Sequence, residues 1–414
     1  MRYRLLPVLF LLLYVLLLSH TSKAQLKKIY LHPKTAGNEK QSRFIDSIRF
    51  IPLEVRNGSA FGAYDQVKVT PDYFLIIEQS GNALLVFSRD GRFLKKILYK
   101  KLGDDFYPSY QAHTNQLVFF GSNKHFELTE RDWQKIRKAW NNPRNKKYYR
   151  KYIVDLADTT FTIRRADPEE NDLVPTEHIY GDYFSRSDIQ SSPQHPDSID
   201  YEFRLYKGWQ LHRMFFPYNR NHETKYLFAE ENVVVHRTDT PTRHWVSRPY
   251  NDTLYRMDAD SLFPFYQLVL PVEHSLPAAF FNRPFRNATE RENFRENNGW
   301  LFCQLVEFME TRRFCYLTVM YFSRRESYVY HKQTGLTYRG QNIKPDSSHY
   351  DLKLLEDGRL VQYGSRFYIL QPAGELAAFF RQHPGVPVPK ELEPYLKNNP
   401  PDDAPVLVEF TFKN

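Results

Sequence analysis

Asp258 and Asp260 are the carboxylates whose spacing comes closest to a metal-binding pattern. They alternate as the first ligands of a calcium-binding loop do, but the glycine and the distal glutamate of such a loop are missing. Four histidines also lie within one stretch, at His212, His222, His236 and His244. Strand alternation separates their side chains, and no third ligand is evident. We therefore predict no metal site and no cofactor, and calcium is left as an alternative without support.

Motifs for enzyme chemistry are missing from the sequence. It contains no His-Glu-x-x-His, Gly-x-Ser-x-Gly, Gly-x-Gly-x-x-Gly, Walker or Cys-x-x-Cys pattern. This absence weakens several enzyme classes but leaves open a site assembled from residues that are distant in the sequence. We predict no catalytic residue.

The two cysteines, Cys303 and Cys315, lie on consecutive predicted strands. A short turn at Phe308 to Glu310 would place the two thiols opposite each other, and an oxidising compartment would then permit a disulfide. Two buried free thiols fit the sequence equally well, because cysteine is a common core residue. Both alternatives remain open at this point.

Basic and aromatic residues alternate between Arg131 and Lys151. The aromatic members are Trp133, Trp140, Tyr148 and Tyr149. Such a cluster could bind an acidic glycan or a protein partner through charge and stacking. The alternative is an amphipathic helix that docks through its aromatic face and keeps its charges in water. We name these four aromatic residues as the candidate binding residues.

Short strands separated by turns must position all of these groups. Residues 232 to 271 contain four strand-like segments separated by Asp- and Pro-containing turns, which indicates one four-stranded antiparallel blade. Residues 67 to 98 show the same pattern. Because such a blade leaves an apolar face uncovered until neighbours stack on it, its repetition predicts an all-β six-bladed β-propeller.

The N-terminus carries the features of an export signal. Arg2 and Arg4 precede an apolar run from Leu5 to Leu18, which is shorter than the roughly 20 residues that span a bilayer, and the pattern Ser22-Lys23-Ala24 follows. We predict a signal peptide over residues 1–24, cleaved after Ala24, and a periplasmic or secreted protein without a lipid anchor or transmembrane segment. The net charge then falls from +9 to +6, because three of 57 basic residues are lost against 48 acids, and nucleic acid is not expected as a partner.

The propeller is predicted to occupy residues 25–414, with two insertions and helical decorations. One insertion covers about 123–151 and includes a helix at 128–140, and the other is a long loop over about 167–200 rich in Pro, Asp, Ser and Gln. Two short helices are expected at 374–382 and 390–396. The strand-like segments 47–55 and 405–413 lie at opposite ends, and we infer that they close the ring in one blade.

Four local patterns resemble a known family. They are Trp245 with the run Tyr250 to Met257, the turn Phe87 to Leu94, the strand Phe50 to Glu54 and the terminal run Ala404 to Val408. Together they are similar to the six-bladed, NHL-like β-propeller proteins exported by Bacteroidetes. The resemblance implies fold and export more strongly than function, since no general activity is assigned to the family. This sequence departs from the family pattern at Lys100 to Asp105, where members of the family usually carry a Gly-Pro-Gly-Glu-type turn.

The sequence favours an exported propeller that binds or scaffolds and does not catalyse. Its aromatic content is 16%, which suits strand packing and also the binding of sugars or peptides. The expected partners are a glycan, a peptide or an envelope protein. The alternative is a hydrolase or lactonase-like enzyme with a divalent metal in the central channel.

Overall fold

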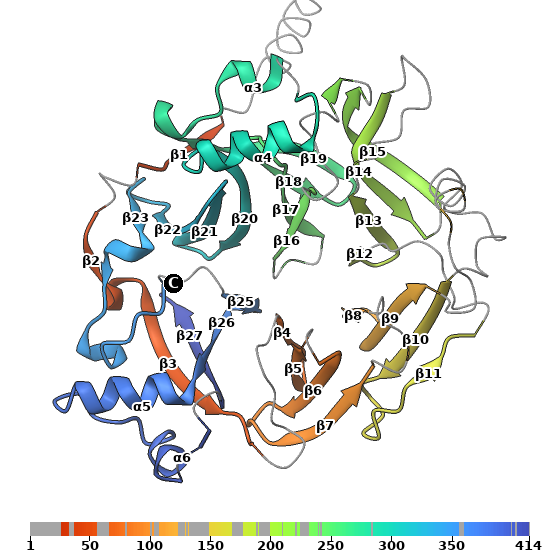
Figure 1. Ribbon diagram of the computed structural model, residues 1–414. Coiled ribbons are helices and arrows are strands. Elements are labelled where there is room, and N and C mark those ends of the chain that lie inside the picture. Colours follow the sequence, from red (N-terminus) through yellow and green to blue (C-terminus); the bar gives the residue numbers. More distant parts are fainter. Residues whose placement is uncertain are drawn as a thin grey trace, which may run out of the picture.

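Six four-stranded antiparallel sheets surround one axis in the computed structural model of the chain (Figure 1). The structure describes residues 26–32, 37–55, 66–78, 81–99, 102, 107–122, 129, 131, 149–167, 177–187, 189, 199–208, 210–219, 222–223, 232–238, 240, 242–282, 285–355, 360–398, 400–401 and 404–413. The predicted six-bladed propeller is therefore confirmed.

We number the sheets as blades 1 to 6. Blade 1 consists of β4 (Gln66–Val69), β5 (Tyr73–Glu78), β6 (Ala83–Ser88) and β7 (Phe93–Leu98). Blade 2 consists of β8 (Tyr107–Gln111), β9 (Gln116–Ser122), β10 (Tyr149–Asp155) and β11 (Arg164–Arg165). Blade 3 consists of β12 (Glu177–Tyr180), β13 (Tyr183–Ser187), β14 (Ile199–Lys207) and β15 (Gln210–Asn219). Blades 4 and 5 consist of β16 (Val234–Arg237), β17 (Arg243–Ser247), β18 (Thr253–Asp258) and β19 (Ser261–Val269), and of β20 (Phe302–Glu310), β21 (Phe314–Tyr321), β22 (Arg325–His331) and β23 (Thr337–Arg339).

Blade 6 closes the ring with strands from both ends of the chain. It contains β25 (Val361–Tyr363), β26 (Arg366–Pro372), β27 (Pro405–Phe412) and the early strand β3 (Ile45–Pro52). Strand β27 pairs antiparallel with β3, with Val408 opposite Phe50. The inferred pairing of the two terminal segments is thus present.

The segment before β3 runs along the outside of two further blades. Strand β1 (Lys27–Tyr30) adds a fifth, parallel strand to β19 of blade 4. Strand β2 (Glu39–Lys40) then pairs in parallel with β24 (Ile343–Lys344), and the 3₁₀ turn η1 (Gln41–Arg43) leads into β3. The first described residues therefore contact blades 4, 5 and 6 in succession.

The predicted loop over 167–200 is partly wrong. Strands β12 and β13 lie inside it and form the inner half of blade 3, joined by a turn at Gly181, whose φ is +51°. Strand β10 likewise starts within the insertion expected at 123–151. The helix expected at 128–140 falls almost entirely outside the described residues.

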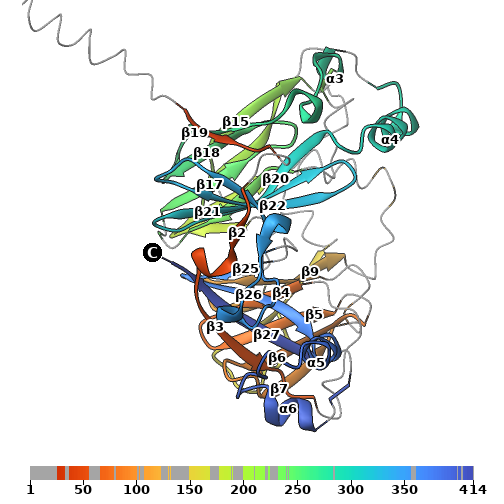
Figure 2. The same cartoon turned by 90° about the vertical axis from the view of Figure 1, so that its left-hand side faces the viewer.

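Helices decorate one face of the ring, which we call the helix face (Figure 2). Among the described residues they are α3 (Ala278–Asn282) and α4 (Ala288–Asn297) between blades 4 and 5, and α5 (Ala373–Gln382) and α6 (Glu393–Lys397) within blade 6. The last two confirm the helices predicted near the C-terminus. The same residues also include the 3₁₀ turns η4 (Val272–His274), η5 (Gly340–Asn342) and η6 (Ser347–His349).

Apolar side chains fill the spaces between neighbouring blades. Separate buried clusters join blades 4 and 5, 5 and 6, 6 and 1, 1 and 2, and 3 and 4. Tight turns bring the blades close: a Cβ on Gly91, whose φ is +90°, would lie 2.2 Å from the carbonyl oxygen of Pro52 in blade 6. Only glycine fits there, because any side chain would collide with this backbone. The result is a rigid ring that fixes the turns at its two faces.

Candidate functional site

The ends of the inner strands bring polar groups from several blades to one end of the axis. The first strand of every blade runs in the same direction and turns back on the face opposite the helices, which we call the turn face. Figure 1 shows β4, β12, β16 and β25 as the strands nearest the axis. Their last residues and the following turns supply the candidate site.

Arg237, the last residue of β16 in blade 4, bridges to blade 3. Its Nη2 donates a hydrogen bond to the carbonyl oxygen of His178, at 2.8 Å, and lies 3.2 Å from Oε1 of Glu177. The side chains of Arg237 and Glu177 are 41% and 56% exposed, so water screens this ion pair and it contributes little to stability. The guanidinium keeps much of its capacity to bind another anion.

Lys68 of β4 brings a second cation from blade 1. Burial lowers the pKa of its ammonium group; Glu177 partly opposes that effect, and Arg237 adds to it. Among the described residues, no carboxylate oxygen lies within salt-bridge distance of Lys68. A desolvated ammonium group beside a guanidinium is stabilised by an anion placed between them.

His113 of blade 2 and His178 of blade 3 stack against each other. Their ring centroids are 3.8 Å apart at an interplanar angle of 17°, and Nε2 of His178 donates to the carbonyl oxygen of Gly181 at 2.9 Å. Burial, together with the charges of His178, Lys151 and Arg237, lowers the pKa of His113 to about 4. Burial also lowers the pKa of His178. Because neutral His178 donates its one N–H to Gly181, its Nδ1 can only accept a hydrogen bond, whereas neutral His113 can donate one N–H to a ligand without adding charge.

Tyrosines from blades 2 and 6 complete the arrangement. Burial raises the pKa of Tyr110 to about 12, with Tyr363 and Asp72 acting in the same direction and Arg237 opposing them. The hydroxyl of Tyr110 donates to Oδ1 of Asn115 at 3.2 Å. Tyr363 lies under the guanidinium of Arg89, 5.5 Å from its ring centroid. The phenol of Tyr110 therefore remains protonated at neutral pH, and the hydroxyl groups of both tyrosines can donate hydrogen bonds.

The charges at this end of the axis favour an anion. Among the described residues that act on these groups, four are cations and two are acids, so the balance is two positive charges; they are Lys68, Arg89, Lys151 and Arg237, and Asp72 and Glu177. The tyrosine and histidine side chains add neutral hydrogen-bonding groups. This combination suits the binding of an anionic ligand by charge-assisted hydrogen bonds.

The predicted alternatives for metal binding meet no support in the described part of the chain. It holds no group of three His, Cys, Asp or Glu residues placed to bind an ion. Asp258 pairs with Arg243 and Arg256 at 3.1 and 2.7 Å, and Asp260 pairs with His212 and Arg213 at 2.8 and 3.2 Å. These carboxylates bind cationic or hydrogen-bonding side chains of the outer strands.

The cysteine pair does not adopt the predicted opposition. Cys315 pairs with Glu310 at one end of the β20–β21 hairpin, while Phe302, next to Cys303, pairs with Tyr321 at the other end. Both side chains are buried. The hairpin turn lies later in the sequence than expected, between Glu310 and Phe314, and this shift of register separates the two sulfur atoms. The two cysteines are therefore not bonded to each other in this structure.

The predicted binding residues Trp133, Trp140 and Tyr148 lie outside the described residues, as does the departing turn at Lys100 to Asp105 except Leu102. Tyr149 is the first residue of β10, and its side chain is likewise outside the described part. The candidate binding role of these four aromatic residues therefore stays a prediction.

Sequence reasoning missed the site at the turn face. Lys68, His113, Arg237 and Tyr363 are each isolated in the sequence, and each sits at the end of a short inner strand or in the turn after it. These residues could have been found by aligning the sequences of the blades. Polar residues at the same end of each first strand are expected to lie near one another around the axis.

Comparison with known proteins agrees with the architecture. The family model DUF5128, described as a 6-bladed beta-propeller, matches residues 20–136. The resemblance seen in the sequence is confirmed. A protein from Bacteroides fragilis described as exported has a similar structure, with a TM-score of 0.56 at 12% identity, covering 94% of this chain and 100% of its own. At that identity the likeness establishes the fold alone.

A second similar structure is a member of the DUF4221 family from Bacteroides vulgatus, with a TM-score of 0.41 and 10% identity over 90% of this chain and 99% of its own. The search of curated proteins gives no significant match. In the described part of the chain, no helix is long and apolar enough to cross a membrane.

Proposed function

We propose that this chain is an exported binding propeller that holds an anionic ligand at the axial end of its turn face. The observation that carries the proposal is the position of Arg237. Its Nη2 contacts Glu177 and the carbonyl oxygen of His178 in blade 3, and the ring of His178 stacks on His113 of blade 2. Its charge also acts on Lys68 of blade 1 and on Tyr110 of blade 2, so groups from four blades lie at the same end of the axis.

The chemistry of this centre supports binding. Two desolvated or partly paired cations attract an anion, and neutral imidazole and phenol groups can orient it. A rigid ring holds these groups in place before the ligand arrives, which reduces the entropy lost on binding. Export through a leader cleaved after Ala24 forms part of the same proposal and agrees with the similarity to a protein described as exported.

Hexaglutamate is a suitable probe, because it offers several carboxylates on an extended chain. We expect isothermal titration calorimetry to show binding that weakens as salt rises, since exposed charges are screened. Arg237→Gln and Lys68→Met should each weaken it about tenfold, which corresponds to roughly 1.4 kcal/mol. Arg381→Gln, on the exposed last turn of α5, changes the net charge equally and should have no effect.

The proposal fails if Arg237→Gln and Arg381→Gln bind hexaglutamate equally. Turnover of a lactone or glycoside panel that is abolished by a chelator would instead support the alternative of a propeller enzyme with a divalent metal.

A further inference from the structure

A second set of binding groups lies on the helix face of blade 5, far from the axial centre in the fold. The loop before β20 runs beside the β21–β22 turn: the backbone N–H of Ser323 donates to the carbonyl oxygen of Gly299 at 3.0 Å, and that of Phe322 donates to Leu301 at 3.1 Å. A Cβ on Gly299 would lie 2.4 Å from Oγ of Ser323, so glycine permits this close approach. The two loops are therefore fixed to each other.

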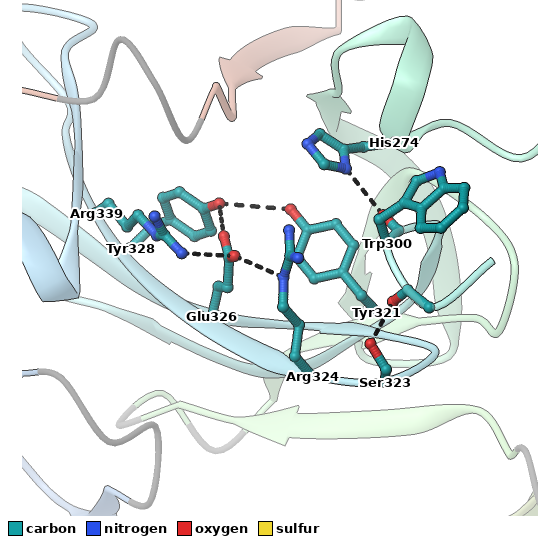
Figure 3. Close-up of polar contacts among 9 residues, drawn as sticks. His274, Trp300, Tyr321, Ser323, Arg324, Glu326, Tyr328 and Arg339 are labelled. Carbon is teal, nitrogen blue, oxygen red and sulfur yellow. Dashed lines mark hydrogen bonds and ion pairs between the residues drawn. The ribbon is translucent and has the colours of Figure 1, made fainter. Parts of the chain in front are cut away.

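Trp300 is presented to solvent by this arrangement. It is 46% exposed, although its neighbour Leu301 is buried. Its carbonyl oxygen accepts a hydrogen bond from Nδ1 of His274, at 2.9 Å, and the ring of His274 lies 5.6 Å from that of Tyr321 (Figure 3). The backbone on both sides of Trp300 is thus held, and its exposed indole offers a flat surface for stacking.

Arg324 is held beside the same group of rings. Its guanidinium lies 5.1 Å from the ring centroid of Tyr321, and its Nε is 2.8 Å from Oε1 of Glu326. The Arg324 side chain is nevertheless 42% exposed. Figure 3 shows the ring of Tyr321 between Arg324 and Trp300. The terminal nitrogens of Arg324 are thus part of a fixed and accessible guanidinium.

Glu326 provides the anchor, and its charge is more than compensated. Its side chain is 1% exposed; Oε1 also accepts from Nη2 of Arg339 at 2.7 Å, and Oε2 accepts from the hydroxyl of Tyr328 at 2.6 Å. Two arginines against one carboxylate leave one positive charge in this cluster of described residues. A buried carboxylate with several donors is a strong fixed support for an exposed arginine.

We propose that Trp300 and Arg324 bind an acidic saccharide, with the ring of a hexuronic acid packed on the indole and its carboxylate on the guanidinium. Both interactions need groups that are fixed in advance. Arginine binds a carboxylate through two parallel N–H···O bonds, and indole offers a flat apolar surface to the C–H face of a sugar. The site goes beyond the anion centre at the turn face, because it uses loops on the opposite face of the ring.

The test uses trigalacturonate, with maltotriose as a neutral trisaccharide of equal length. We expect trigalacturonate to bind the mature chain and maltotriose to bind at least tenfold more weakly. Trp300→Ala should reduce trigalacturonate affinity at least tenfold, whereas Trp300→Phe should retain part of it. Arg324→Gln should remove the preference for the acidic sugar, and Arg324→Lys should restore part of it.

Matched controls separate this site from general charge and from the turn face. Arg325→Gln changes a neighbouring exposed arginine and Leu336→Ala removes another exposed apolar side chain, which is 53% exposed; neither should alter binding by more than twofold. Arg237→Gln should leave trigalacturonate binding unchanged. Failure of the saccharide proposal can therefore be distinguished from failure of the proposed axial anion site.

Two outcomes would overturn the proposal. One is equal affinity of the wild type, Trp300→Phe and Arg324→Lys for trigalacturonate, with the fold checked by circular dichroism. The other is that substitutions of Trp300 and Arg324 weaken hexaglutamate binding but leave trigalacturonate binding unchanged. That result would assign these residues to the binding of an acidic peptide.

Discussion

His236 shows how one buried residue joins two blades. Its Nε2 lies 2.9 Å from Oγ of Ser247, and its Nδ1 accepts the backbone N–H of Phe308 in blade 5 at 3.2 Å. Oγ of Ser247 in turn donates to the carbonyl oxygen of Leu305 at 2.7 Å. Because Nδ1 accepts a hydrogen bond, the imidazole must be neutral for this network to persist. In the sequence, His236 is one of four neighbouring histidines for which no third metal ligand is evident, and the structure gives it this role between blades.

This network predicts a loss of stability in acid. Burial lowers the pKa of His236 to about 3, whereas the unfolded residue has its ordinary value near 6.5. Stability is therefore complete above pH 6.5 and is lost as the pH falls from 6.5 toward 3, because the unfolded chain then takes up the proton more readily. At pH 4.5 the loss should be roughly 2–3 kcal/mol.

Urea unfolding at pH 7 and pH 4.5 measures this loss. His236→Gln should be less stable than the wild type at pH 7 but should lose less on acidification. His383→Gln, at the exposed end of α5, serves as the control and should lose as much as the wild type. The same acid loss in wild type and His236→Gln would contradict the assignment.

Blades 1 and 4 could be predicted at the level of elements because their signals are local. Their strands alternate or cluster apolar residues, and turns such as Ser88 to Gly91 separate them. Strands β12 and β13 were missed because they are short and lie in a stretch whose Pro, Asp and Ser content resembles a loop. The parallel pairing of β1 with β19 was missed because its partner is distant in the sequence.

Helix α4 was also missed, although its sequence carries a start signal. Oδ1 of Asn287 accepts the backbone N–H of Glu290 at 2.9 Å, and Oε2 of Glu290 accepts that of Arg286 at 2.7 Å. This closely resembles a capping box, and the pattern Asn-x-x-Glu was available in the sequence. The candidate site at the turn face had no such local signal, because its residues meet only after the ring has closed.

Strand β1 should contribute substantially to stability despite its four residues. Ile29 is fully buried between blades 4 and 5, and the preceding and following residues point outward. Ile29→Ala should lower the free energy of unfolding by about 2–4 kcal/mol through lost burial and a cavity. Tyr30→Ala, at a 57% exposed position of the same strand, should change it by less than about 0.5 kcal/mol in the same urea titration. Equal effects would show that β1 is not held by its buried face.

The whole molecule depends on joining its two ends. Strand β27 lies between β26 and β3, and its side chains Val406, Val408 and Phe410 are buried. Removing residues 404–414 leaves β26 and β3 without their common partner and exposes the apolar faces of blade 6. The chain should then be insoluble or should melt at a much lower temperature.

Differential scanning calorimetry of this truncation is the direct measurement. Truncation of residue 414 alone is the control and should leave the melting temperature unchanged. An unaltered melt after removal of 404–414 would show that the ring holds without its last strand.

The pairing of β3 with β27 also determines when the ring can close during synthesis of the chain. The partner of Phe50 is Val408, so this contact cannot form until residue 408 has been synthesised. Contacts between residues so distant in sequence form slowly, because a long loop must close first. Until β27 has been synthesised, the ring therefore cannot close. For a chain with the predicted export leader, this delay leaves time for the unfolded chain to cross the membrane. The ring then closes after export.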